Sequence, residues 1–111
     1  MARRPGRKGA QYLYLTTTGR RSGLSRQIEI WFTQYGGRYY LVAEHRERAQ
    51  WVRNLMAAPR VGVRVGRRRF AAQARVIDAR ADPELACAVK KLSEEKYGWG
   101  SGLVVELAPT R

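Results

Sequence analysis

The chain has 111 residues, close to the commonest size of a single domain, and no repeat or low-complexity segment divides it. Its 22 Lys and Arg against 9 Asp and Glu leave a net charge of +13, which favours anionic partners such as phosphorylated ligands, nucleic acids or anionic membrane surfaces. The single cysteine excludes an intramolecular disulfide and a multi-cysteine metal site.

Residues 1–11 are predicted to form a basic N-terminal arm ahead of one domain that spans residues 12–111. The arm lacks the apolar run of a secretory signal, and no apolar stretch is long enough to cross a bilayer. We therefore expect a cytoplasmic protein. Cys87 is expected to be a small buried residue on a helix.

Three strands and a tight turn are predicted in the first part of the domain. Tyr12–Thr18 is rich in aromatic and β-branched residues, which favours a strand that ends in a basic loop. Gln27–Tyr35 begins with alternating apolar and polar residues and predicts a second strand. The glycine pair at 36–37 indicates a hairpin, whose return strand is Arg38–Ala43.

A short helix and a second hairpin follow. Residues 49–58 carry apolar side chains at helical spacing, so we expect a short helix that Pro59 ends. Residues 61–65 and 69–77 alternate apolar and polar side chains and predict two further strands joined by a turn at Gly66.

The last third of the chain predicts one longer helix and a short strand. Asp82 and Pro83 suit the start of a helix, and Gly98 suits its end. The apolar stripe of this helix is expected to comprise Leu85, Val89 and Leu92. Residues 103–107 predict the final strand.

The expected fold class is mainly β (α+β), with about five to six antiparallel strands, one short helix between hairpins and one late helix. Successive hairpins in so small a chain indicate a small barrel or a strongly curled sheet. The β–α–β rhythm of a parallel sheet is absent, which disfavours a dinucleotide-binding domain.

Metal and hydrolase sites are disfavoured by the residues present. His45 is the only histidine, and the acidic residues form no tight cluster that would complete a metal site. A catalytic triad would have to use His45, and none of the serines lies in a nucleophile-elbow pattern. We therefore expect no metal.

The segment LTTTGRRSG at residues 15–23, with Arg26 beyond it, has the composition of an anion-binding loop. Glycines let backbone N–H groups approach a ligand closely, and arginines make bidentate contacts to phosphate or carboxylate. A solvated basic turn explains the same residues, and the segment alone leaves both interpretations open. The same holds for the aromatic side chains Trp31, Tyr39, Tyr40 and Trp51, which suit either a core or the wall of a heterocycle site.

Taken together, four stretches resemble the deazaflavin (coenzyme F-420)-dependent nitroreductase family. They are LTTTGRRSG followed by Arg26, WF…GGRYYLVA, WVRNL ahead of Pro59, and RVGVRVGRRRFAAQARV, in matching order across about residues 12 to 77. The C-terminal KYGWGSGLVVEL is similar to the ending of a short subgroup. The resemblance implies a split β-barrel related in fold to FMN-binding pyridoxamine-phosphate oxidases.

The resemblance also implies a cofactor and the residues that bind it. The reduced coenzyme F-420 carries a phosphodiester and glutamate carboxylates on its tail, which suits a basic groove. The tail and its loop would involve Thr18, Gly19, Arg20, Arg21, Ser22 and Arg26. The deazaflavin ring would pass along Ala43, Glu44 and His45, with Trp51 and Asn54 on the short helix completing that side.

By the same resemblance, the reaction is hydride transfer to a small-molecule electron acceptor, such as a quinone, a nitro compound or another activated double bond. Tyr97 and Trp99 are the expected lid residues over the acceptor. No residue is assigned as a catalytic general acid, and a homodimer stays open.

The chain departs from the family pattern beside the expected ring site. Many members have a serine and a Gly-Gly before the short helix, where this chain has AEHRERAQW, and a proline near position 29, where it has glutamate. Glu29 and Glu44 are expected to pair with nearby arginines; otherwise they narrow the ring site.

Two alternatives remain beside the deazaflavin reductase. One is a related barrel that binds FMN or another amphipathic ligand without this activity. The other is a basic β-barrel that binds nucleic acid, since single-strand binders combine cationic grooves with stacking aromatics. The net charge also predicts a weak attraction to nucleic acid or anionic membranes.

Overall fold

The computed structural model describes residues 11–110, so the expected basic arm at 1–11 lies almost wholly outside the described residues. The strands are β1 (Tyr12–Thr18), β2 (Ser25–Trp31), β3 (Thr33–Tyr35), β4 (Arg38–Ala43), β5 (Arg60–Val65), β6 (Arg68–Val76) and β7 (Leu103–Pro109). The helices are α1 (Gln50–Ala57) and α2 (Pro83–Tyr97), and a 3-10 turn, η2 (Arg46–Arg48), precedes α1. The expected class, mainly β with two helices, is confirmed.

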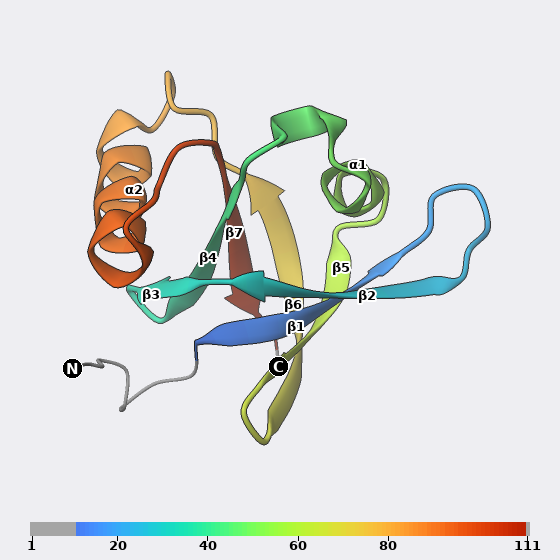
Figure 1. The fold of residues 1–111 in the computed structure, drawn as a ribbon. Coiled ribbons are helices and arrows are strands. Elements are labelled where there is room, and N and C mark those ends of the chain that lie inside the picture. The colour runs from blue at the N-terminus through green and yellow to red at the C-terminus, as the bar shows by residue number, and fades with distance from the viewer. Residues whose placement is uncertain (1–10, 111) are drawn as a thin grey trace.

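All the strands belong to one antiparallel sheet in the order β2-β1-β5-β6-β7-β4-β3. The strands at its two ends, β2 and β3, are separated in sequence only by Phe32. The chain therefore bends at Phe32 from one end of the sheet to the other, and the sheet curls into a half-barrel (Figure 1). This bend divides the single strand predicted at 27–35 and brings the strand number to seven, above the expected five to six.

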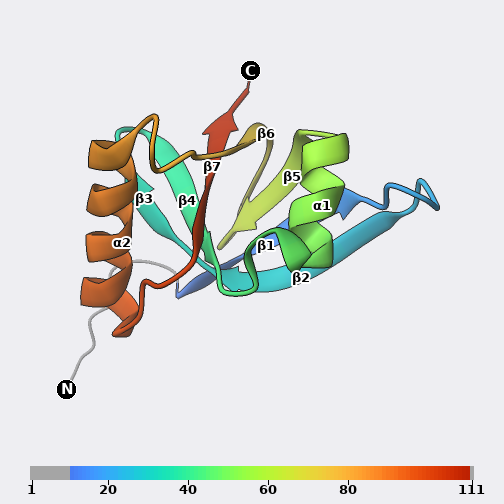
Figure 2. The same ribbon diagram turned by 90° about the horizontal axis from the view of Figure 1, so that it is seen from above.

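The main core fills the inside of this curled sheet. Its fully buried side chains alternate along the strands, as Leu13 and Leu15 do on β1. Leu55 of α1 packs into the same core, so α1 lies over one end of the barrel (Figure 2). The helix thereby brings its other residues beside the loop that joins β1 to β2.

A second, smaller core joins α2 to the outer face of the sheet. Tyr40 of β4 and Val104 of β7 pack there against Ala86 and Val89 of α2. The buried face of α2 comprises Ala86, Val89 and Ser93. Of the predicted stripe, Val89 is fully buried, whereas Leu85 and Leu92 are partly buried. The expected burial of Cys87 is wrong, because it lies on the exposed side of this helix.

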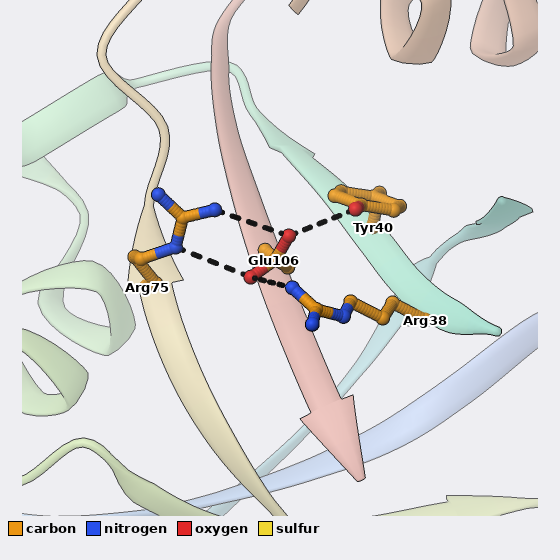
Figure 3. A network of polar contacts seen from close by, with 4 residues as sticks. All are labelled: Arg38, Tyr40, Arg75 and Glu106. Atoms are coloured by element: carbon orange, nitrogen blue, oxygen red, sulfur yellow. Dashed lines mark hydrogen bonds and ion pairs between the residues drawn. The ribbon is translucent and has the colours of Figure 1, made fainter. Parts of the chain in front are cut away.

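A polar network ties the middle of the sheet together on the α2 side (Figure 3). The buried carboxylate of Glu106 on β7 accepts hydrogen bonds from the Tyr40 hydroxyl at 2.8 Å and from Nε of Arg75 at 3.2 Å. Nη1 of Arg38 lies 3.2 Å from the same carboxylate. Burial alone would raise the pKa of Glu106, but the hydrogen bonds from these three partners outweigh it and lower the pKa below its ordinary value.

The turns between strands use glycine where the backbone demands it. Gly36 and Gly37 have φ of 60° and 80° in the two-residue turn between β3 and β4, as the hairpin prediction requires. Within residues 11–110, no helix is long and apolar enough to cross a membrane.

Candidate functional site

Two clefts lie beside α1 and share one wall, the side chain of Trp51. The first, of about 800 Å³, is called the basic cleft because Arg20, Arg21, Arg26 and Arg53 line it. The second, of about 730 Å³, is called the aromatic cleft because it is walled by Tyr12, Trp31, Phe32, Tyr40, Trp51 and Trp99. A ligand with an anionic part and a flat part would therefore find both surfaces joined at Trp51.

The β1–β2 loop forms one side of the basic cleft and is held by its own backbone. The Gly19 N–H donates to the Leu24 carbonyl at 2.8 Å, and the Gly23 N–H donates to the Gly19 carbonyl at 2.8 Å. A Cβ atom at Gly19 would lie 2.7 Å from the Ser22 Oγ, and Gly23 has φ of 75°. Gly23 therefore needs glycine to keep this loop conformation, whereas a side chain at Gly19 would displace the Ser22 hydroxyl.

Arg20 of this cleft is held in place by a residue of α1. Its Nη1 donates to the Asn54 Oδ1 at 2.8 Å, and its backbone N–H reaches the same oxygen at 3.3 Å. Asn54 is buried on α1, so the loop and the helix are tied together at this contact. The side chains of Arg21 and Arg26 make no hydrogen bond or ion pair within residues 11–110 and keep their donors for a ligand.

A buried hydroxyl also lies at the basic cleft without a partner. Thr17 is 2% exposed, and its Oγ1 makes no hydrogen bond with any residue in the range 11–110. A buried polar atom is costly to leave unpaired, which points to a ligand atom that completes it. Thr18, the predicted residue next to it, is exposed and is not among the residues lining the cleft.

The aromatic cleft collects all three tryptophans of the chain: Trp31 from the end of β2, Trp51 from α1 and Trp99 from the turn after α2. Gly98 has φ of 76° where α2 ends, and a Cβ at Gly100 would lie 2.5 Å from the Lys90 carbonyl. The Ser93 hydroxyl donates to the Trp99 carbonyl at 2.6 Å. Trp99 is therefore held by a tight turn with little freedom.

Tyr97, the other predicted lid residue, does not line this cleft. Its ring stacks on Trp31 with centroids 4.4 Å apart, and its hydroxyl accepts the Phe32 N–H at 3.0 Å. Burial raises the pKa of Tyr97 to about 12, so the hydroxyl stays protonated. Tyr97 thus supports the bend at Phe32 from behind and sets the position of Trp31.

The ionised side chains that line the aromatic cleft are both acidic: Glu29 on β2 and Glu44 just after β4. Neither forms an ion pair with an arginine of the described chain, contrary to expectation. The negative charge of Glu29 is the main cause that raises the pKa of Tyr12, followed by the effect of Tyr14. The two carboxylates therefore give the lining of this cleft a negative charge, opposite to the positive charge of the basic cleft.

The segment that departs from the family pattern closes the aromatic cleft at one edge. Ala43 is buried, whereas Glu44 and His45 are exposed and line the cleft. Arg46 follows with φ of 51°, a left-handed conformation that glycine adopts at lower cost. Nε of Arg53 donates to the Glu47 carbonyl at 2.9 Å and fastens the segment to α1.

The structure thus sorts the predicted site residues into two groups that meet at Trp51. The basic cleft includes Gly19, Arg20, Arg21, Ser22, Arg26 and Asn54, and the aromatic cleft includes Ala43, Glu44, His45 and Trp99. Sequence reasoning missed Arg53 and Thr33, which also line these clefts. Arg53 lies inside the WVRNL stretch, so it could have been predicted as a lining residue from that stretch. Thr33 could not, because no neighbouring residue in the sequence indicates that the bend at Phe32 turns its side chain inward. No group of three possible metal ligands occurs among the described residues.

The chain is similar to known proteins in sequence pattern and in fold. A family model described as "F420H(2)-dependent quinone reductase" matches residues 4–101. No curated protein matches the chain. Solved structures of similar fold include an F420-H2 dependent reductase, with 23% identity, a TM-score of 0.68 and coverage of 87% of this chain and 92% of that one.

Two further structures share the fold at low identity. The heme storage protein HutZ from Vibrio cholerae has a TM-score of 0.75 and 21% identity, and the alignment covers 92% of this chain and 83% of HutZ. A putative pyridoxamine 5'-phosphate oxidase from Listeria innocua has a TM-score of 0.72 and 13% identity, with coverage of 91% and 85%. These likenesses support the split-barrel architecture.

Proposed function

Because the chain belongs to the F420H(2)-dependent quinone reductase family, we propose that it transfers hydride from the reduced deazaflavin coenzyme to a quinone. The observation that carries this proposal is the pair of clefts that share Trp51, one lined by four arginines and the other by three tryptophans. An anionic tail and a flat redox ring need these two surfaces side by side.

The basic cleft fits the phosphodiester and carboxylates of the coenzyme tail. Arg20 is already oriented by Asn54, so its guanidinium would bind an anion with little loss of side-chain freedom. The unpaired Thr17 hydroxyl would donate to an oxygen of the tail. Arg21, Arg26 and Arg53 would add charge-assisted contacts.

The aromatic cleft fits the ring and leaves space for an acceptor. Trp51 would guide the ring from the basic cleft, and Ala43, Glu44 and His45 would lie along its edge. Trp31 and Trp99 would cover the acceptor and keep water away. The exposed Glu44 and His45 do not fill this space, so the altered segment is compatible with the ring.

When bound, the reduced deazaflavin supplies a hydride, and a quinone that takes this hydride and one proton becomes a hydroquinone. The contribution of the protein is to hold donor and acceptor face to face in a site of low water content. Aromatic walls suit that task, because they contact both rings without competing chemistry.

Titration of the coenzyme against the purified protein, followed by the fluorescence of the deazaflavin, tests this proposal. The double variant Arg20→Ala/Arg26→Ala should bind about 100-fold more weakly than the unchanged protein, since each charge-assisted contact is worth about 1.5–3 kcal/mol. The matched control, Arg67→Ala/Arg80→Ala, removes the same charge from exposed turns away from both clefts and should change the affinity less than threefold.

The titration is paired with a quinone-dependent assay of coenzyme oxidation. An equal loss of coenzyme affinity in both double variants would indicate nonspecific attraction by charge, and it would contradict the proposal that the tail binds in the basic cleft. If the protein does not bind the coenzyme but binds FMN and shows a yellow flavin spectrum, the flavin-binding alternative is favoured.

A further inference from the structure

The aromatic cleft carries a charge of the opposite sign to the chain as a whole. Its two ionised lining residues are Glu29 and Glu44, and no Lys or Arg of residues 11–110 lines it, although the chain has 22 of them. Lys96 comes near, but its ammonium donates to the Phe32 carbonyl at 2.9 Å and is not a lining residue. The charged lining of this cleft within residues 11–110 is therefore acidic.

Within residues 11–110, neither carboxylate forms an ion pair with an arginine. Glu29 lies on β2 opposite Tyr14 of β1, and its charge acts on the hydroxyl of Tyr12 at the cleft wall. Glu44 lies between the end of β4 and His45, where the chain leaves the barrel wall. Both side chains are exposed to the solvent of the cleft, so a ligand there experiences their negative charge.

We propose that Glu29 and Glu44 make the aromatic cleft select neutral or cationic quinones and reject anionic ones, which rests on the proposed function. A sulfonate or carboxylate on the acceptor is repelled within the cleft, and this repulsion is about three- to fivefold in affinity for each exposed carboxylate a few ångströms away. The same negative charge repels the anionic tail of the coenzyme from the aromatic cleft, so the tail stays in the basic cleft.

The probes are three naphthoquinones that share one ring system and differ in one substituent: methyl, sulfonate, or trimethylammonio-methyl. The variants are Glu29→Gln, Glu44→Gln and their double, which keep the side-chain volume and remove the charge. The control Glu84→Gln/Glu95→Gln removes two charges from exposed positions of α2.

The first readout is kcat/KM of the coenzyme-loaded enzyme, with each quinone compared between variant and unchanged protein so that its redox potential cancels. The double variant should raise kcat/KM for the sulfonate about tenfold relative to the methyl quinone and lower the value for the cationic quinone relative to the methyl quinone. The control should change none of them by more than twofold.

The second readout needs no coenzyme. Because all three tryptophans line this cleft, saturable quenching of their fluorescence reports quinone binding to it directly. The sulfonate should bind more weakly than the methyl quinone in the unchanged protein, and the double variant should remove that difference. High salt should shrink it as well.

The proposed selection by charge would be overturned if the double variant changed kcat/KM similarly for all three quinones, or if the quinones quenched the tryptophan fluorescence without saturation. Failure of the coenzyme to bind would instead contradict the proposed function, and it is seen separately in the coenzyme titration. In that case, the order in which the three quinones bind without coenzyme, measured by tryptophan quenching, still tests the charge of the aromatic cleft.

Discussion

The two clefts are built from the chain in different ways. The basic cleft draws on two short stretches, residues 17–28 and 50–54, and is held by hydrogen bonds such as that between Arg20 and Asn54. The aromatic cleft draws on five separate places, from Tyr12 to Trp99, and is held by packing and by the bend at Phe32. The basic cleft is thus formed locally, whereas the aromatic cleft depends on the whole barrel.

This contrast also separates the signs of charge. A chain of net charge +13 has four arginines on one side of Trp51 and, on the other, two carboxylates that form no ion pair within residues 11–110. The net charge of the chain therefore does not describe the local charge of each cleft.

The largest expected effect comes from the sheet behind the aromatic cleft. Glu106→Gln should lower the free energy of unfolding by about 2 kcal/mol at pH 7, because the acceptor of the hydrogen bonds from Arg75 and Tyr40 loses its negative charge while Arg75 keeps its positive charge. Tyr40 lines the aromatic cleft, so quinone quenching should weaken while coenzyme-tail affinity changes little. Urea unfolding measures the loss, with Glu95→Gln as the exposed control.

The pH dependence of that loss has a definite sign. The folded protein lowers the pKa of Glu106, so the ionised carboxylate stabilises the fold above its ordinary value of 4.5. This contribution disappears as pH falls from about 4.5 through the lowered folded value. The difference between the unchanged protein and Glu106→Gln should be constant from pH 6 to 8 and shrink below about 4.5; a pH-independent difference would contradict the network.

The next effect isolates the orientation of Arg20 in the basic cleft. Asn54→Ala removes the oxygen that holds its guanidinium and should weaken coenzyme binding about tenfold, or about 1.4 kcal/mol. Quenching by the uncharged quinone should stay within twofold, because the aromatic cleft keeps its walls. Equal losses at both clefts would indicate that α1 has shifted as a whole.

A smaller effect of opposite direction is expected at the edge of the aromatic cleft. Arg46→Gly should raise the free energy of unfolding by about 0.5–1 kcal/mol, since the left-handed conformation at φ of 51° costs arginine more than glycine. Arg48→Gly in the same 3-10 turn is the matched control and should lower stability by a similar amount. Thermal unfolding of both variants at one pH gives the comparison.

The smallest effects compare the two unpaired hydroxyls, one at each cleft. Thr17→Val and Thr33→Val each remove a buried hydroxyl without a partner, so neither should destabilise the coenzyme-free protein. Thr17→Val should weaken coenzyme binding about threefold, and Thr33→Val should raise KM for the quinone about threefold. Thr17→Val should leave KM for the quinone unchanged, and Thr33→Val should leave the coenzyme affinity unchanged. The opposite result for both variants would reverse the assignment of the clefts.

Much of the local structure follows from the amino-acid order alone. The strands at Tyr12–Thr18 and Arg38–Ala43 have the predicted bounds, and the glycine turn and the short helix before Pro59 are where they were expected. The loop with Arg20 and Arg26 was also recognisable. In each case the deciding interactions reach only a few residues along the chain, through strand alternation, helical spacing, turn geometry and charge density.

The rest depended on contacts between distant residues. Nothing near Phe32 marks the break between β2 and β3; the bend is supported by Tyr97 and Lys96 at the far end of α2. The same contacts explain why Tyr97 lies behind Trp31, and why Thr33 lines a cleft. Closing a curled sheet is a property of all its strands together, so the basic loop between β1 and β2 was visible in the sequence, whereas the aromatic cleft appears only when the barrel closes.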